Sequence, residues 1–333
     1  VLLNLLTQAG VGMTTLPQSQ AQLERRIIRS EASFAGGLAL SEQGYVFVLE
    51  DTAKSEVVGI CAIEAAVGLK EPWYNYRVGV TVHASEELQV YSRHDTLFLS
   101  NDHTGSTELC SLFLHPDYRI NRNGTLLSKS RFLFLAEFAQ CFAPVVVAEM
   151  RGVSDQNGYS PFWEALGRHF FSIDFAEADY LTGIGKKAFV AELMPKYPVY
   201  VDLLPHEAQA VIGRTHAKTQ PARALLESEG FRYEGYIDIF DAGPTMQAYT
   251  TDIRAVRESR VGSTLWVAPD VKKHFTVDYL VANTLFEGFR AILVKAEQDV
   301  KHVFPLTQTE ATRLNVKEGD PIRFVAVSPT RNT

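Results

Sequence analysis

Cysteine is scarce in this sequence, and the few cysteines present do not form a recognisable site. Of 333 residues only Cys61, Cys110 and Cys141 are cysteine, and each lies alone within an apolar segment. No C-x-x-C pair occurs, so neither a disulfide framework nor a thiol redox motif is indicated. An odd number of separated cysteines is typical of buried thiols in a reducing compartment. We therefore expect a cytoplasmic protein.

Several other signatures are missing. The sequence has no H-E-x-x-H, no complete P-loop and no G-x-S-x-G, which removes support from metal-dependent hydrolysis, nucleotide hydrolysis and serine hydrolase chemistry. No apolar run approaches membrane-spanning length, and residues 1–6 are too short for a signal sequence and lack its basic flank. The net charge of -7 argues against a nucleic-acid footprint over the whole surface and leaves a local basic patch open. We expect small molecules or proteins as partners, with no nucleic acid and no membrane.

The sequence does have an ordinary globular composition, with 46% hydrophobic residues and a length that suggests two domains. Within it, residues 109–114 form a short apolar run typical of a buried strand, which ends at His115-Pro116-Asp117. Apolar residues then recur at spacings that place them near one face of a helix: Leu126, Leu127, Phe134 and Phe138. The segment 108–138 therefore predicts a strand, a loop and a helix.

Basic residues crowd the turn between this strand and helix. Arg119, Arg122, Lys129 and Arg131 lie close together in an acidic chain, and Gly124 would let the backbone approach an anion closely. A helix N-terminus adds unpaired N–H groups and the positive end of the helix dipole. The turn therefore predicts a phosphate or pyrophosphate site. The alternative is a plain connection with solvated arginines.

The remaining pattern predicts an α/β protein with a mixed sheet flanked by helices. The apolar run 145–150 follows the helix and would form a parallel crossover unit with the strand before it. Helices are expected at residues 2–6, 20–33, 160–170 and 221–229, and further strands at 45–49, 57–63, 77–82, 96–99 and 231–240.

A charged stretch, residues 251–262, marks a domain boundary. It divides the chain into an N-terminal domain, residues 1–255, and a small β-rich C-terminal domain, residues 262–333. In the latter, apolar runs near 280–281, 289–294 and 322–327 predict strands. Two segments of the first domain each read as a helix, a glycine and an aromatic strand, which leaves open a partial internal repeat after about residue 175.

His216 is one candidate for chemistry, because it lies in a loop just before a helix, where a general acid or base can face a cleft. A solvated loop histidine is the alternative, and the sequence alone hardly separates His216 from His83, His103 or His169.

Carboxylates and one thiol are the other candidates. Glu64, Glu108 and Glu149 interrupt apolar strand runs, where a carboxylate is costly unless it is paired or faces a site. Exposure at a strand end is the alternative. Residues 101–105 offer polar side chains before the central strand but also fit a plain turn. Cys110 has no evident neighbouring base, which favours a structural thiol over a nucleophile.

Taken together, the strand, the basic loop, the helix and the parallel strand resemble the superfamily of acyl-CoA-dependent N-acyltransferases that includes histone acetyltransferases (a GNAT-like core). That superfamily usually has R/Q-x-x-G-x-G/A in this loop; Arg119 and Gly124 match, and Arg122 stands at the middle glycine. A more specific resemblance is to the bacterial arginine N-succinyltransferase family. It is based on residues 44–51 (GYVFVLED), 72–77 (PWYNYR), 99–105 (LSNDHTG), 147–152 (VAEMRG), 159–163 (YSPFW) and 236–241 (YIDIFD).

This resemblance implies transfer of succinyl from succinyl-CoA to the α-amine of L-arginine, giving N2-succinyl-L-arginine and CoA, without a metal. It identifies His216 as the catalytic proton donor, although the chemistry alone fits an acid or a base, and Leu112 as a succinyl-CoA contact. The other expected acyl-CoA residues are Phe113, Leu114, Arg119, Arg122, Asn123, Gly124 and Thr125. Either Glu108 or Glu149 would pair with the substrate guanidinium.

The resemblance also implies that subunits associate, as a homo-oligomer or with a related second subunit. The family normally opens with one further strand ahead of Val1, so the chain is expected to begin after that strand. Two alternative functions are succinylation of ornithine or another cationic amino acid, and a non-catalytic subunit that binds acyl-CoA.

Overall fold

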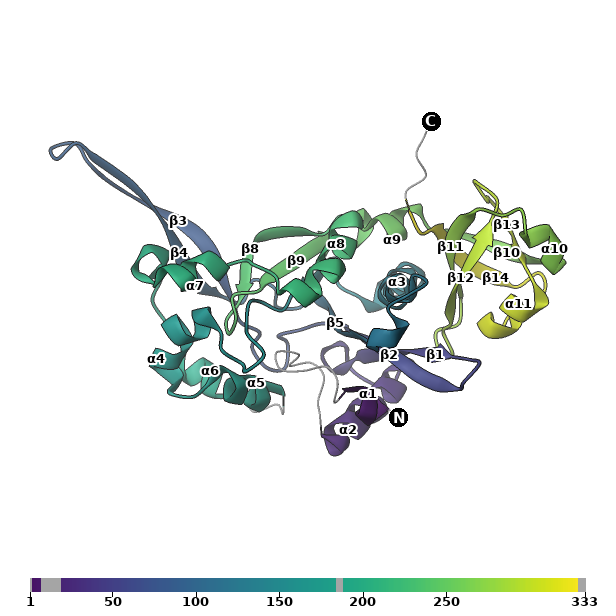
Figure 1. The fold of residues 1–333 in the computed structure, drawn as a ribbon, viewed down its shortest axis with the longest axis horizontal. Coiled ribbons are helices and arrows are strands. Elements are labelled where there is room, and N and C mark those ends of the chain that lie inside the picture. The colour runs from purple at the N-terminus through teal and green to yellow at the C-terminus, as the bar shows by residue number, and fades with distance from the viewer. Residues whose placement is uncertain (1, 7–18, 184–187, 329–333) are drawn as a thin grey trace.

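The computed structural model describes residues 2–6, 19–183 and 188–328, and most of its strands form one large sheet (Figure 1). This nine-stranded sheet has the order β1-β2-β5-β6-β9-β8-β3-β4-β7. Its strands are β1 Gly44–Asp51, β2 Glu56–Glu64, β3 Asn75–Ser85, β4 Val90–Ser100, β5 Thr107–Leu114, β6 Val145–Glu149, β7 Val199–Tyr200, β8 Arg232–Asp238 and β9 Pro244–Tyr249.

The predicted hairpin and the predicted crossover are both confirmed. β1 and β2 pair antiparallel, while β5 and β6 pair parallel and are joined by helix α3, Asn123–Glu137. Residues of β5 and β6 are almost all buried, as their unbroken apolar runs predict for strands at the centre of a sheet. The loop between β5 and α3 is therefore held at the middle of the large sheet.

Helix α3 is buried well beyond the apolar face that the sequence indicated. Every residue from Leu127 to Leu135 is buried. One side of the helix contacts β2 and β5, and the other contacts β11, β12 and β14 of a second sheet. A helix covered on both sides is buried all round, which is why its polar residues also lie in the interior.

Helices cover both faces of the large sheet. Helix α2 packs on β1, and its Ser30 and Ser33 hydroxyls accept hydrogen bonds from the Val46 and Gly44 backbone N–H groups. The helices of the first domain are α1 Leu2–Leu6, α2 Gln20–Phe34, α3, α4 Arg168–Phe171, α5 Phe175–Gly183, α6 Ala188–Leu193, α7 His206–Val211, α8 Gln220–Ser228 and α9 Arg254–Glu258. Within the described ranges, no helix is both long and apolar enough to cross a membrane.

The second of the two similar segments contains the predicted helix and strand, α8 and β8, whereas the first contains its predicted helix, at residues 161–171, but no strand. After the helical turn Trp163–Gly167 the chain continues as α4 and α5. The aromatic residues there, Phe171 and Phe175, pack with Trp163 in a core under β3, β4 and β8 instead of forming a strand. A strand in the first unit of the suggested repeat is therefore wrong.

The C-terminal part forms a five-stranded sheet, order β12-β11-β14-β10-β13. Its elements are β10 Arg260–Trp266, α10 Pro269–Lys272, β11 Val277–Asn283, β12 Ala291–Ala296, β13 Val303–Leu306, α11 Gln308–Leu314 and β14 Pro321–Ala326. The sequence did not predict α11, although Thr307 and Glu310 form a capping box whose spacing is visible in it. We propose that the two sheets mark two domains, residues 1–255 and 262–333.

Strands β3 and β4 are much longer than the predicted strands at 77–82 and 96–99. They pair from Asn75↔Ser100 to Ser85↔Val90. The outer part of this hairpin projects from the body of the molecule, at the upper left of Figure 1.

Candidate active site

The two central parallel strands stay together for only a short distance. β5 pairs with β6 at Thr107↔Val146 and Glu108↔Val147. From Leu109 to Leu114 it pairs with β2 alone. The register with β2 shifts between Ile60 and Ala62, so that an extra residue of β5 forms a bulge. Ser111 in this bulge has a φ of 56°. Bulges re-aim backbone groups and are common beside active sites.

The loop after β5 ends at a helix N-terminus that is prepared for an anion. Asn121 and Arg122 both have positive φ, and Arg122 is an N-cap without a side-chain hydrogen bond. The first-turn N–H groups of α3 are therefore not capped by that side chain. A Cβ built on Gly124 would meet only the Leu114 side chain, at 3.8 Å, so protein packing does not require glycine there. The space above Gly124 suits a phosphate.

The side chains predicted around this cradle are in different situations. Arg119 is exposed, and its Nε donates to the Leu114 carbonyl at 3.1 Å. Asn123 donates to the Tyr118 carbonyl and so fixes the loop. Arg122 forms an ion pair with Asp278 of β11 at 3.1 Å, which draws its charge toward the C-terminal sheet. Thr125 lies half-buried in the first turn of α3.

The three apolar residues predicted at the acyl-CoA site belong to the core by their side chains. Phe113 packs with Leu5, Leu6 and Leu23 of α1 and α2 on one face of the sheet. Leu114 and the half-buried Leu112 pack on the other face with Leu127 of α3. Because the side chains of Phe113 and Leu114 are in the core, only their backbone groups are available to a ligand.

Lys129 and Arg131 do not belong to the basic turn, contrary to the sequence expectation. Both are buried inside α3. Lys129 pairs with Glu229 at 2.5 Å, and Arg131 donates to the carbonyls of Ala62 and Cys110 at 3.3 Å. Arg26 of α2, which the sequence did not single out, brings another cation to the bulge, because its guanidinium donates to the Ser111 hydroxyl at 2.7 Å.

Carboxylates gather where β5 and β6 begin to separate. Glu108 is buried on β5, and Glu149 ends β6. Desolvation, followed by the charges of Asp238 and Glu108, raises the pKa of Glu149 well above its ordinary value. Desolvation likewise raises the pKa of Asp238. Among the described residues no cationic side chain forms an ion pair with Glu149 or Asp238. Glu149 and Asp238 are therefore desolvated carboxyl groups without a cationic partner among the described residues.

A buried polar network supports Glu149. The Asn75 amide nitrogen donates to Glu149 Oε1 at 2.9 Å and to Thr245 Oγ1 at 3.3 Å. This orients the Asn75 oxygen toward His103 Nδ1 at 3.0 Å, and His103 Nε2 lies 2.7 Å from Gln247 Oε1. The sequence pointed to residues 101–105 only as a polar segment. Asn75 and Gln247 left no signal, because they come together with His103 only through strand pairing.

The loop carrying His216 is anchored to the end of β6. The His216 backbone N–H donates to the Arg151 carbonyl at 2.8 Å. The next residue, Gly152, donates to Asp241 Oδ2 at 2.7 Å, and any Cβ at Gly152 would overlap the Asp241 backbone. Asp241 also accepts from the Gly243 N–H, so it ties the exit of β6 to the turn between β8 and β9. These contacts join the His216 backbone to the residues that directly follow β6.

The His216 ring is half-buried and biased toward its neutral form. Desolvation, followed by the positive charges of Arg151 and Lys218, lowers its pKa, while a hydrogen bond with the Ser154 backbone opposes this shift. Nδ1 accepts from the Lys218 N–H at 3.1 Å. In the neutral ring the proton is therefore on Nε2, which makes Nε2 the donor.

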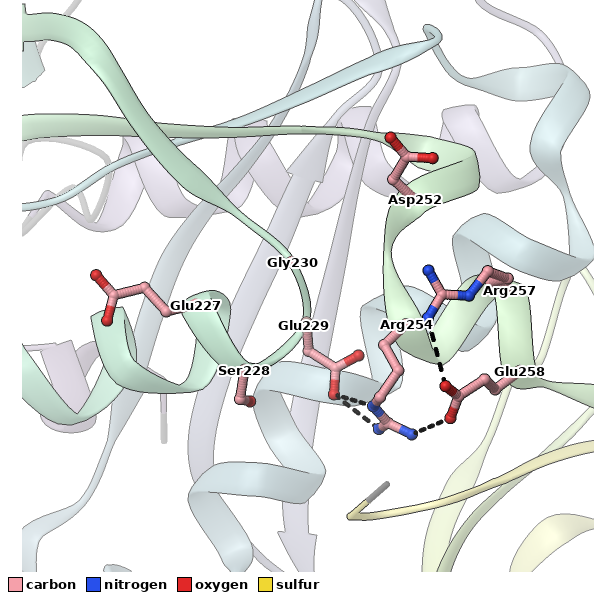
Figure 2. Close-up of a pocket in the computed structure, with 8 residues that line it drawn as sticks. All are labelled: Glu227, Ser228, Glu229, Gly230, Asp252, Arg254, Arg257 and Glu258. Carbon is pink, nitrogen blue, oxygen red and sulfur yellow. Dashed lines mark hydrogen bonds and ion pairs between the residues drawn. The ribbon is translucent and has the colours of Figure 1, made fainter. Parts of the chain in front are cut away.

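A surface pocket includes Glu229, the ion-pair partner of Lys129, in its wall (Figure 2). It is lined by Glu227, Ser228, Glu229, Gly230, Asp252, Arg254, Arg257 and Glu258. Its charged side chains are largely paired with each other, as the contacts of Glu229 with Arg254 and of Arg254 with Glu258 show. None of the residues that the sequence singled out as site candidates lines it, and its paired charges leave little to bind a ligand.

Comparison with known proteins gives a consistent result. A family model described as arginine N-succinyltransferase beta subunit matches residues 1–255, and one for the C-terminal domain of that subunit matches residues 262–326. The arginine N-succinyltransferase of Yersinia enterocolitica is 53% identical over 98% of this chain and 94% of its own length. That of Citrobacter koseri is 53% identical over 100% of this chain and 96% of its own.

A solved structure is also similar over nearly the whole chain. It is that of arginine/ornithine succinyltransferase subunit AI from Pseudomonas aeruginosa. It matches with a TM-score of 0.89 and 37% identity, covering 98% of this chain and 95% of that one.

Proposed function

Because the chain belongs to the arginine N-succinyltransferase family, we propose that it transfers succinyl from succinyl-CoA to the α-amine of L-arginine. The products are N2-succinyl-L-arginine and CoA, and the reaction is the first step of arginine catabolism by the succinyltransferase route. The class, an acyltransferase, follows from the family. The substrates and the roles of individual residues are the proposal.

The observation that carries the substrate class is the pair of desolvated carboxyl groups, Glu149 and Asp238. Glu149 and Asp238 have raised pKa values and no cationic partner among the described residues. A guanidinium is planar, always charged and able to bond two carboxylate oxygens at once. A bound arginine side chain would supply the missing charge to Glu149, with Glu108 beside it. A neutral amino acid would leave Glu149 and Asp238 desolvated and without a counter-charge.

Succinyl-CoA is proposed to lie along the bulge and the N-terminus of α3. Its pyrophosphate would bind the first-turn N–H groups of Gly124 and Thr125, with Arg119, Arg122 and Asn123 around it. Its thioester carbonyl would face backbone groups near Leu112, Phe113 and Leu114, where β5 leaves β6. The thioester would then lie between the cradle and the carboxylate cluster.

The reaction forms a bond from the arginine α-nitrogen to the thioester carbon and breaks the bond from that carbon to sulfur. The incoming neutral amine makes an oxyanion, which backbone donors at the bulge stabilise. His216 donates a hydrogen bond through Nε2–H to the departing sulfur, and the proton that this sulfur takes up is the one that the nitrogen loses as it becomes an amide. Nδ1 bonding to Lys218 supports this assignment, because it leaves Nε2 as the donor.

Ornithine is a second candidate acceptor, because the similar Pseudomonas aeruginosa protein is named an arginine/ornithine succinyltransferase. That protein is also named a subunit, which supports association of this chain with a second copy or a related chain. We also propose a cytoplasmic location, since Cys61, Cys110 and Cys141 are free thiols.

The test is release of CoA thiol from succinyl-CoA by the parent and by His216→Gln, with L-arginine, ornithine or lysine as acceptor. We expect arginine-dependent release in the parent and a loss of roughly 100-fold or more in kcat in the variant. His169→Gln, at an exposed helix position, is the matched control and should keep parental activity.

Two results would contradict the proposal at different points. Full activity of His216→Gln would remove that residue from the chemistry while leaving the reaction in place. A folded parent that binds succinyl-CoA but releases no thiol with any of the acceptors would favour a non-catalytic acyl-CoA-binding subunit.

A further inference from the structure

The outer half of the β3–β4 hairpin is left without a covering layer. On β3 only Asn75–Arg77 pair with β8, and on β4 only Thr96 and Leu97 pair with β7. Beyond these residues the two strands pair only with each other, out to Ser85↔Val90. We call residues 78–95 the arm. It projects from the body of the molecule (Figure 1). A two-stranded ribbon is marginally stable in water unless one of its faces is covered.

The two faces of the arm differ in what already contacts them. On one face, His83 Nε2 lies 3.0 Å from the Tyr200 hydroxyl, and His94 Nδ1 lies 2.5 Å from Asp202. Thr81 and Thr96 share a hydrogen bond on that face. The two histidines on this face therefore contact another part of the same chain.

The opposite face carries the apolar side chains and is exposed. By the strand register it consists of Val80, Val82, Ala84, Tyr91, Arg93 and Asp95. Val80 is 46% exposed, Val82 47% and Tyr91 74%. A hairpin in water would normally show the reverse, with its polar face outside. An apolar face kept exposed on a projecting element is typical of an interaction surface.

This exposed face continues a buried one. Nearer the body of the molecule, the same face carries Tyr76 and Val78 on β3 and Leu97 and Leu99 on β4. These residues belong to the core formed with Trp163 and Phe171. The apolar stripe thus runs out of the core onto the arm without a break. Along the arm, no helix of the described chain takes over the covering role that α4 to α7 have near the body.

We propose that the exposed face of the arm binds the same face of a second copy of this chain. Arg93 and Asp95 lie two residues apart on this face, and neither forms an ion pair among the described residues. In an antiparallel two-fold contact, Arg93 of each copy meets Asp95 of the other while the valines and Tyr91 pack between them. One patch that carries both charges is complementary to itself, as an isologous interface requires.

The proposed contact supplies a surface for the subunit association proposed above. It stands or falls independently of the proposed acyl transfer. The test is sedimentation equilibrium of the full chain over a range of concentrations, which reads mass and not turnover. We expect a dimer for the parent. Val82→Glu should raise its dissociation constant by about 10-fold or more, because a charge would be buried in the contact. Val48→Glu is the matched control, since Val48 is also 47% exposed on a strand, and it should leave the dimer intact.

A charge exchange tests the geometry. Arg93→Asp or Asp95→Arg alone would place like charges opposite each other and weaken the dimer, and the double variant should restore it. A monomeric parent overturns the proposal, as does a dimer that Val82→Glu leaves unchanged. Failure of the double variant to restore the dimer overturns the antiparallel pairing. Circular dichroism confirms that each variant is folded.

Discussion

Glu149 is a residue whose burial opposes the stability of the folded chain. Its carboxyl is desolvated beside Asp238 and Glu108, and the Asn75 amide donates a hydrogen bond to it. Burying a carboxylate without a counter-charge costs free energy of folding. The proposed guanidinium would offset this cost only when substrate is bound, and on this basis we propose that Glu149 serves substrate recognition.

Glu149→Gln separates these two roles. The pKa of this carboxyl is raised in the folded state, so its contribution to stability is greatest below the ordinary value of 4.5 and is lost as the pH rises toward the raised pKa. The amide keeps the oxygen that Asn75 bonds but never ionises. We therefore expect the variant to be at least as stable as the parent, with a difference that grows as the pH rises above 4.5, as urea unfolding would measure.

The same variant should lose affinity for arginine. We expect its KM for arginine to rise about 30-fold or more while the KM for succinyl-CoA stays unchanged. In the parent, the KM for arginine should rise as the pH falls, because protons then compete with the guanidinium for Glu149. Glu56→Gln, an exposed glutamate on β2, is the control. A strongly destabilised Glu149→Gln with parental KM would show a structural role instead.

The sequence indicated some of these residues and not others for a physical reason. Glu108 and Glu149 were visible because a carboxylate inside an apolar strand is unusual. His103 was visible only as one of several histidines in a polar segment, and Asn75 and Gln247 were not visible, because a single polar residue in a strand or a turn looks the same whether it is solvated or buried. Only the pairing of β3, β8 and β9 brings them together.

At the scale of elements, the strand, loop and helix around Gly124 could be predicted from local patterns, but the surroundings of α3 could not. Apolar spacing located the helix, and a proline-containing turn located the end of β5. The burial of Lys129 and Arg131 depends on Glu229 and on carbonyls of β2 and β5, which no spacing within the helix reveals.

Gly124→Ala tests the anion cradle. Gly124 lies in the first turn of α3, its φ is not in the left-handed region, and a Cβ there meets only Leu114 at 3.8 Å. Alanine in a helix is favoured over glycine by up to ~1 kcal/mol, so the variant should unfold at an equal or higher urea concentration. If a pyrophosphate closely approaches this backbone, the methyl group should raise the KM for succinyl-CoA about 10-fold or more.

The effect of Gly124→Ala on the KM for succinyl-CoA is to be compared with its effect on the KM for arginine. The KM for arginine should stay within about 2-fold of the parental value, because the cradle and the carboxylates hold different substrates. An unchanged KM for succinyl-CoA in a stable variant would show that the ligand does not approach Gly124. Equal losses for both substrates would indicate a shift of the whole loop.

For the whole molecule, a charged stretch that predicts a domain boundary could be read from the sequence, but the order of the strands could not. The charged stretch near residue 255 could be seen in composition, and β10 begins at Arg260. The sequence does not show that β8 and β9 insert between β6 and β3, because such long-range pairing depends on how whole faces pack. It also does not show that α3 serves both sheets.

A buried ion cluster joins the two sheets behind α3. Glu229, which is 0% exposed, accepts from Lys129 of α3 at 2.5 Å and from Arg254 of α9 at 2.8 Å. Both cations also donate to the Val327 carbonyl just after β14, at 3.0 and 3.2 Å. Figure 2 shows Glu229 and Arg254 facing each other at the pocket wall. The end of the C-terminal sheet is thus held by charges that belong to the first domain.

Glu229→Gln should therefore destabilise the whole chain. It leaves Lys129 buried without a carboxylate and Arg254 with Glu258 alone, and breaking a buried pair in this way costs about 3–5 kcal/mol. Glu227→Gln is the control two residues away, because Glu227 pairs with Arg223 on the surface of α8 and should change stability by less than about 0.5 kcal/mol. Urea unfolding measures both. Equal stability of the two variants would mean that backbone and apolar contacts, not the ion cluster, hold the C-terminal sheet against α3.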